Sequence, residues 1–282
     1  DRFGSGGDRA VSRTRSGWLG QPTGQSGLLV PVLLGGVLLA YFALPFVTFL
    51  ARVGSTPIIE GLSTADAGQA IRHSLVTAPI STAIATGFGV PLAYVLARRS
   101  FPGKRLVEAV VVLPMVVPPL VGGAMILTAV GRFTPVGAAA ANLGVPLTGS
   151  LIGVVLAQTF VAAPFVIITA RAGFGAIDER LEQASRSLGY GPLATFWNVS
   201  LPLARGTIVA GIVLTFARAM GEFGATMMVA YNPRTIPTQI WVDFIGGGID
   251  AILPLALALV GLTLLVVAAI QRVGRLPTVG EG

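Results

Sequence analysis

Long apolar runs alternate with short polar segments along the whole of this chain. Six runs are predicted to be membrane spans, at residues 28–50, 74–97, 106–130, 149–170, 206–230 and 251–271. A helix needs about 20 residues to cross the hydrocarbon core of a bilayer, and each run reaches that length. The pattern predicts an all-α integral membrane protein with its membrane domain at 28–272, a disordered N-terminal tail at 1–27 and a short C-terminal tail at 273–282.

The composition agrees with this class. Of the 282 residues, 53% are hydrophobic and 11% are charged, whereas soluble domains carry roughly 25% charged residues. The net charge of +7 is not taken as a sign of nucleic-acid binding, because the basic residues lie between the apolar runs. There they are better explained by the orientation of the chain in a lipid bilayer.

Most of the 19 arginines and lysines fall on one side of the predicted membrane. That side receives Arg2, Arg9, Arg13, Arg15, Arg98, Arg99, Lys104, Arg105, Arg171, Arg180, Arg186, Arg205, Arg272 and Arg275. The other side receives Arg52, Arg72, Arg132 and Arg234. Cytoplasmic loops are enriched in basic residues. The chain is therefore predicted to be a multi-pass cell-membrane protein with both termini and the 171–205 loop in the cytoplasm.

The polar segment 178–203, within this loop, is predicted to form two short helices. Asp178 is a good N-cap and Gly189 is placed to end the first helix. One face of that helix is predicted to contain Leu181, Ala184, Ser185 and Leu188. Pro192 can open the second helix, which would carry exposed Phe196 and Trp197. From the residues alone, the segment is either an amphipathic loop on the membrane surface or a docking element.

The same segment resembles the EAA motif of ABC importer permeases, which reads Glu-Ala-Ala, three residues, Gly, nine residues, Ile, one residue, Leu-Pro. The matching register is Gln183-Ala184-Ser185, Gly189, Val199 and Leu201-Pro202. Two identities depart from the motif, at Gln183 and Ser185, and Glu182 lies one position before the family glutamate. The resemblance implies a type I importer permease fold in which this segment couples to an ATP-binding subunit. The coupling residues would be Glu182, Gln183, Ala184, Ser185, Leu188, Gly189, Leu201 and Pro202.

The chain itself lacks the sequence of an ATP site. Its one lysine, Lys104, is followed by Arg105, whereas a P-loop requires Gly-Lys followed by Ser or Thr. No nucleophile–base pair is seen, and His73 is the one histidine in a chain without cysteine. No catalytic residue, metal site or cofactor is therefore predicted in this chain, and ATP and Mg would be bound by the partner subunit.

Charged residues inside the fifth predicted span are the most unusual chemistry. Arg218 and Glu222 are four residues apart and share one helical face. Charges at membrane depth are costly and are usually paired or face an aqueous cavity. The pair, with Gly221 and Phe223 beside it, is interpreted either as part of a transport pathway or gate, or as a structural ion pair.

The third predicted span opens with Pro114, Pro118 and Pro119, followed by two glycines. Such residues break the helical hydrogen-bond pattern, which membrane proteins tolerate where protein or a cavity satisfies the freed backbone groups. This stretch is interpreted either as a bent helix that lines the pathway or as a kinked packing helix.

Together, Leu113-Pro-Met-Val-Val-Pro-Pro119 and Ala217-Arg-Ala-Met-Gly-Glu-Phe-Gly-Ala225 resemble the molybdate and sulfate branch of importer permeases. The resemblance implies an ATP-driven importer of a tetrahedral oxyanion, molybdate first, that works by alternating access as a permease homodimer with ATPase subunits and an external binding protein. Sulfate or tungstate are the alternatives within this architecture. An ATP-independent secondary transporter or channel is the alternative from another class.

Overall fold

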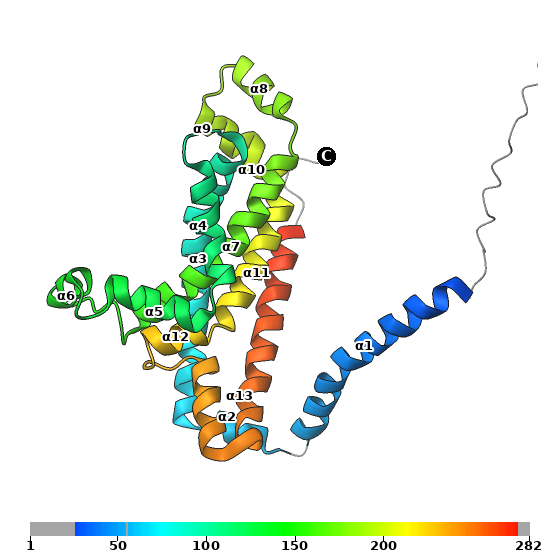
Figure 1. The fold of residues 1–282 in the computed structure, drawn as a ribbon, viewed down its shortest axis with the longest axis vertical. Helices are drawn as coiled ribbons and strands as arrows, with labels where there is room; N and C mark the ends of the chain where they lie inside the picture. Colours follow the sequence, from blue (N-terminus) through cyan, green and yellow to red (C-terminus); the bar gives the residue numbers. More distant parts are fainter. Residues whose placement is uncertain (1–25, 55, 276–282) are drawn as a thin grey trace, which may run out of the picture. The chain divides into compact units, whose positions relative to one another are not determined.

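The computed structural model describes residues 26–54 and 56–275, and the regular structure within them is helical (Figure 1). The chain divides into two units, residues 1–52 and 53–282. All described residues of the first unit lie in α1 (Ser26–Val53), a 28-residue helix that contains the predicted first span and ends one residue beyond the unit. The predicted N-terminal tail falls almost entirely outside the described residues.

Four long helices form the body of the second unit and run side by side (Figure 1). They are α3 (Ala65–Arg98), α7 (Leu151–Ala176), α11 (Arg205–Met220) and α13 (Ile236–Arg275). Helix α7 is central, because it packs against α3, α4 and α11. The buried positions of α3 are mostly Ala, Ser, Thr and Gly, and small residues let membrane helices approach closely. A short helix, α2 (Ile58–Leu62), packs against α13.

Helices α7 and α11 are interlocked by glycines that face threonines. A Cβ atom added at Gly173 would collide with Thr207, and one added at Gly211 would collide with Thr169 and approach the Val166 backbone. Neither glycine can therefore be enlarged without moving the neighbouring helix. These contacts fix the distance between the two helices in the first half of α11.

The predicted third span, 106–130, is divided into two helices at the prolines that were expected to bend or kink it. Helices α4 (Lys104–Val116) and α5 (Pro119–Val130) are separated at Val117 and Pro118. Val117 is extended, with ψ of 130°, because the ring of a proline disfavours the helical conformation in the residue before it. Pro119 then opens α5, where the missing amide costs nothing. Helix α6 (Pro135–Asn142) follows α5 at a bend of 69°.

Two other predicted boundaries change. The fifth span is also broken, because α11 ends at Met220 and α12 (Gly224–Val229) begins four residues later. Helix α13 is divided by a kink at Gly248, which has φ of 72°, so its second part begins close to residue 251, where the sixth span was predicted to start, and a further helical segment from Ile236 precedes the kink. Helix α13 also continues to Arg275, so helical structure enters the predicted C-terminal tail. The rest of that tail lies outside the described residues.

The described helices fit a multi-pass membrane protein. Four of them, α1, α3, α7 and α13, are long and apolar enough to cross a bilayer. The number rises to six if each of two bent pairs is one span. These pairs are α5 with α6, and the segment Pro192–Leu203 with α11, which are bent by 76°.

Candidate functional site

The 178–203 segment lies beyond one end of the four long helices (Figure 1). It consists of α8 (Glu179–Ser187), α9 (Pro192–Thr195), a π-helical turn η1 (Phe196–Ser200) and α10 (Leu201–Leu203). Asp178 caps α8, because its Oδ1 accepts a hydrogen bond of 2.9 Å from the Arg180 amide. Gly189 has φ of 90° after the end of α8, and Pro192 opens α9. The predicted capping residues, terminating glycine and opening proline are thus confirmed.

Helix α8 has an inner and an outer face, and they differ from the prediction. Glu182 and Ser185 are buried, and Ser185 Oγ lies 3.1 Å from the Thr195 hydroxyl of α9. Leu181 and Leu188, which were expected to share a face with Ser185, are 49% and 79% exposed. The outer face of α8 thus presents two leucines, Leu181 within the helix and Leu188 at its C-terminal cap, among polar side chains, and both are uncovered within the described part of the chain. Gln183 and Ala184 are exposed as well.

The prediction that both aromatic residues of the second helix are exposed is wrong for one of them. Phe196 is buried, because its ring packs edge-on against Tyr94 at 4.9 Å between centroids and lies 6.0 Å from Phe174. Trp197 is 57% exposed. The Phe196 ring therefore holds η1 against the ends of α3 and α7.

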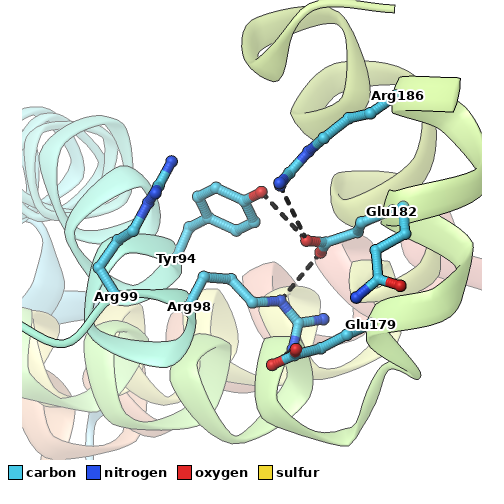
Figure 2. Close-up of a pocket in the computed structure, with 7 residues that line it drawn as sticks. Tyr94, Arg98, Arg99, Glu179, Glu182 and Arg186 are labelled. Atoms are coloured by element: carbon cyan, nitrogen blue, oxygen red, sulfur yellow. Dashed lines mark hydrogen bonds and ion pairs between the residues drawn. The ribbon is translucent and has the colours of Figure 1, made fainter.

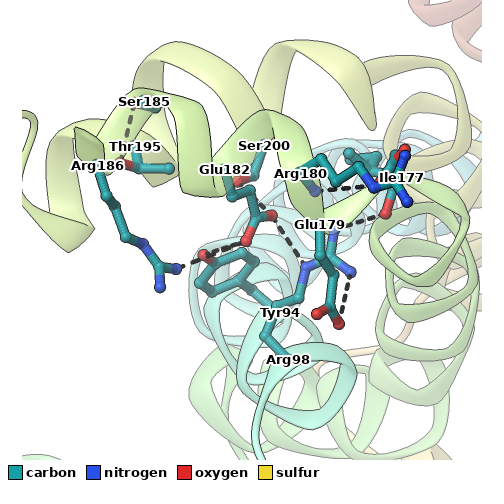
Figure 3. A network of polar contacts seen from close by, with 11 residues as sticks. Tyr94, Arg98, Ile177, Glu179, Arg180, Glu182, Ser185, Arg186, Thr195 and Ser200 are labelled. Carbon is teal, nitrogen blue, oxygen red and sulfur yellow. Dashed lines mark hydrogen bonds and ion pairs between the residues drawn. The ribbon is translucent and has the colours of Figure 1, made fainter. Parts of the chain in front are cut away.

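A network of hydrogen bonds and ion pairs centres on the buried Glu182 carboxylate, at the mouth of a small cavity of about 90 Å³ (Figure 2). Arg98, in the last turn of α3, donates from Nε to Glu182 Oε1 at 2.9 Å. Ser200 Oγ donates to the same oxygen at 2.8 Å, and Tyr94 donates to Oε2 at 3.4 Å. Arg186 lies 3.7 Å from Oε2. One carboxylate thus connects three helical elements (Figure 3).

The sequence prediction found Glu182 but not its partners. Its partners Arg98, Tyr94 and Ser200 were not assigned to the coupling residues. Arg98 was counted only among the basic residues that predict the orientation of the chain in the membrane. The sequence did offer one indication of the pair. Arg98 is a basic residue at the end of a predicted span, and Glu182 is an acidic residue in a loop that was predicted to lie on the same side of the membrane.

We expect Gly189→Ala to weaken the turn between α8 and α9. No atom lies within 4 Å of a Cβ added at Gly189, but its φ of 90° is unfavourable for an L-residue. The left-handed conformation costs roughly 1–2 kcal/mol for alanine, so amide hydrogen exchange across 186–191 should accelerate. Gly191→Ala is the matched control, because Gly191 also has open space but a φ of −68°. Equal exchange in the two variants would contradict the prediction.

A second candidate region forms where the two broken spans meet. The α4–α5 break and the α11–α12 break line an open cavity of about 400 Å³, with Pro118, Pro119, Leu120, Arg218, Gly221, Glu222, Phe223 and Gly224 as its lining. Close packing holds the breaks together, because a Cβ at Gly224 would press on Pro119 and one at Gly123 would meet the Ala225 backbone. The structure thus brings together the predicted pathway residues except Pro114, which lies inside α4.

The Arg218–Glu222 pair joins the end of α11 to the start of α12. Arg218 Nη1 lies 2.6 Å from Glu222 Oε2, and this contact is an ion pair, since Oε2 accepts no hydrogen bond of good geometry. Glu222 Oε1 accepts a bond of 2.7 Å from the Ala225 amide, which satisfies an otherwise free amide in the first turn of α12. Glu222 is 1% exposed, whereas the Arg218 side chain is 27% exposed. The arginine is therefore the more accessible of the two charges.

Comparison with known proteins adds to this geometry. Residues 89–276, which include the 178–203 segment and the cavity, match the model of the family described as binding-protein-dependent transport system inner membrane component. The chain belongs to this family. Membership favours the importer permease over the secondary transporter or channel that the sequence left as an alternative.

Relatives of this permease extend over most of its length. It is 46% identical to a probable molybdenum ABC transporter permease protein of Haloferax volcanii, over 87% of this chain and 90% of the relative. It is 40% identical to the molybdate/tungstate transport system permease protein of Thermococcus kodakarensis, over 82% and 89% of the two chains.

A solved structure shows the same fold at low sequence identity. It is a bacterial alginate ABC transporter in complex with an alginate-bound periplasmic protein, with a TM-score of 0.69 and 15% identity over 89% of this chain and 94% of the other. The predicted all-α permease fold is confirmed.

Proposed function

We propose that this chain is the membrane-spanning subunit of an ATP-driven importer of a tetrahedral oxyanion, molybdate, which works by alternating access. The observation that carries the proposal is the identity of 46% to a probable molybdenum permease over 87% of the chain. Tungstate is a second substrate candidate, because the Thermococcus relative is described as a molybdate/tungstate permease. Sulfate, which has the same charge and a similar shape, is the third candidate.

The cavity at the two helix breaks is the proposed part of the pathway in this chain. A bare carboxylate at the path would repel a divalent anion, since like charges are poorly screened away from water. Glu222 is buried and held by Arg218 and by the Ala225 amide, whereas Arg218 reaches the cavity. The pair would therefore present its positive partner to the oxyanion. Two copies of the chain would enclose the complete path between them.

The outer face of α8 is the proposed contact with the motor. Leu181 and Leu188 are exposed and lie on a short helix outside the four long helices, so an apolar groove on an ATP-binding subunit could cover them. In this proposal the chain is non-catalytic, its partner binds ATP and Mg, and an external binding protein delivers the anion. Both termini and the 178–203 segment would face the cytoplasm, as the distribution of arginines favours.

The test is uptake into proteoliposomes by the chain reconstituted with its ATP-binding subunit and binding protein. We expect uptake of radiolabelled molybdate that requires ATP, competition by excess tungstate, and weak competition by excess sulfate. Equal competition by sulfate would reassign the substrate. Molybdate flux through this chain alone, without ATP or motor, would overturn the importer mechanism.

A further inference from the structure

The inner face of α8 carries a buried charge, the Glu182 carboxylate. Docking of the outer face onto another subunit does not require such a charge. The proposed contact with the motor is the outer face, where Leu181 and Leu188 are exposed. Glu182 lies about 100° around the helix from Leu181 and faces the permease, where 4% of its side chain is exposed, and its ion-pair partner Arg98 is likewise only 7% exposed. A buried charge persists only when it is paired and hydrogen-bonded, and this carboxylate has three hydrogen-bond donors.

The partners of Glu182 come from elements that are separate in sequence (Figure 3). Arg98 ends α3, and Ser200 ends η1. The same arginine also donates from Nη2 to the Ile177 carbonyl at 3.1 Å, which lies at the end of α7. Its Nη1 is 3.8 Å from the exposed Glu179, so that contact contributes little. Arg98 and Glu182 together therefore tie α8 and η1 to the ends of α3 and α7.

We propose that the Arg98–Glu182 pair is the internal fastener that makes the 178–203 segment move as one body with the ends of α3 and α7, and that Arg98 is its positioning residue. Glu182 then serves inside the permease and does not contact the motor. The inference rests on the proposed function, because the motion in question is the one that an ATP-binding subunit imposes on α8.

The packing beyond the fastener supports transmission along the permease. Helix α7 is locked to α11 through the glycine–threonine contacts at Gly173 and Gly211. Helix α11 ends at Met220, between Arg218 and Glu222, which both line the cavity. A displacement of α8 that reaches α7 through Arg98 is thus carried by close contacts to the proposed pathway. Without the fastener, α8 could move on the motor while α3 and α7 stay in place.

The alternative is that Glu182 binds the motor directly, as the family motif suggests for its neighbour Gln183. The two roles differ in what a variant loses. Loss of a motor contact releases the motor, whereas loss of an internal fastener leaves the motor bound and lowers the substrate moved for each ATP hydrolysed.

The experiment uses the assembled complex of permease, ATP-binding subunit and binding protein in proteoliposomes. Arg98→Met, Glu182→Gln and the double variant are compared for motor retained on purification, radiolabelled molybdate taken up per ATP hydrolysed, and amide exchange across 179–188. Arg99→Ala is the control, since Arg99 is an exposed basic neighbour on the rim of the same cavity. The double variant has no buried unpaired charge, so it carries the test if a single variant does not assemble.

We expect motor retention in all variants, at least about tenfold less uptake per ATP in Arg98→Met, and a double variant no worse than that single one, because coupled residues are not additive. Exchange across 179–188 should rise with the loss, and Arg99→Ala should behave as the parent. Release of the motor by Glu182→Gln, multiplied losses in the double variant, or unchanged uptake per ATP in Arg98→Met would each overturn the proposal. Absence of ATP-dependent uptake in the parental complex would instead refute the proposed function.

Discussion

The double variant Leu181→Ser with Leu188→Ser is expected to lose its ATP-binding subunit during purification. Both leucines lie on the outer face of α8 and are 49% and 79% exposed, so the fold of the permease should be little affected. Covering a leucine side chain is worth about 1.5–3 kcal/mol, and removal of two such contacts should weaken binding at least about 100-fold. Titration of the motor against the purified permease measures this affinity.

Leu143→Ser provides the matched control for that variant. Leu143 is 82% exposed and follows α6, far along the chain from α8, so its replacement should leave motor affinity within about twofold of the parent. Parental affinity in the α8 double variant would show that the motor binds another surface. An unstable permease would show that the outer face packs within the chain.

Arg218→Met is expected to lower molybdate uptake at least about tenfold in the reconstituted complex. The change leaves the Glu222 carboxylate, 1% exposed, without its counter-charge beside the cavity. Loss of one partner of a buried pair costs about 3–5 kcal/mol, and somewhat less here because Arg218 is partly exposed. The same change would place net negative charge on the proposed path of the anion. Uptake is measured at saturating and at limiting molybdate. A loss at saturating molybdate reports on the amount of assembled complex, whereas a loss confined to limiting molybdate reports on affinity for the anion.

Two further variants serve as controls for the uptake of the Arg218→Met complex. Arg218→Met combined with Glu222→Gln removes both charges, and it should recover assembly of the complex while uptake remains low. Lys104→Met removes the cation of another i,i+4 pair, in which Lys104 Nζ lies 4.0 Å from a partly buried Glu108 that is also paired with Arg171 at 2.8 Å, and it should change uptake by less than about twofold. Parental uptake in Arg218→Met would contradict a role for the arginine in the pathway.

Local features of the fold were predictable because their causes are local. The long apolar runs specify helices through length and composition alone, and Asp178, Gly189 and Pro192 act on backbone groups within a few residues of themselves. The helix break at the third span was also signalled by its prolines. Which proline would divide the helix was less visible, since Pro114 is accommodated inside α4 while Pro118 and Pro119 separate α4 from α5.

Features that depend on tertiary contact were not predictable from spacing. Phe196 reads as an exposed aromatic on a short helix, yet Tyr94 and Phe174 cover it. The inner face of α8 reads as apolar, yet it contains Glu182 because Arg98, distant in sequence, supplies the compensating charge. The meeting of two broken spans at one cavity likewise requires the pairing of α5 with α12, which a single sequence does not reveal.

Helix α11 is an unbroken helix of 16 residues that follows a bend of 76° and ends at the break after Met220. At a rise of 1.5 Å per residue its length is about 24 Å, which makes it a lever between the 178–203 segment and the cavity. A tilt of about 10° around one end would displace the other by about 4 Å. That distance is close to the separation of two touching carbon atoms. A small rotation at one end is therefore enough to make or break a side-chain contact at the other.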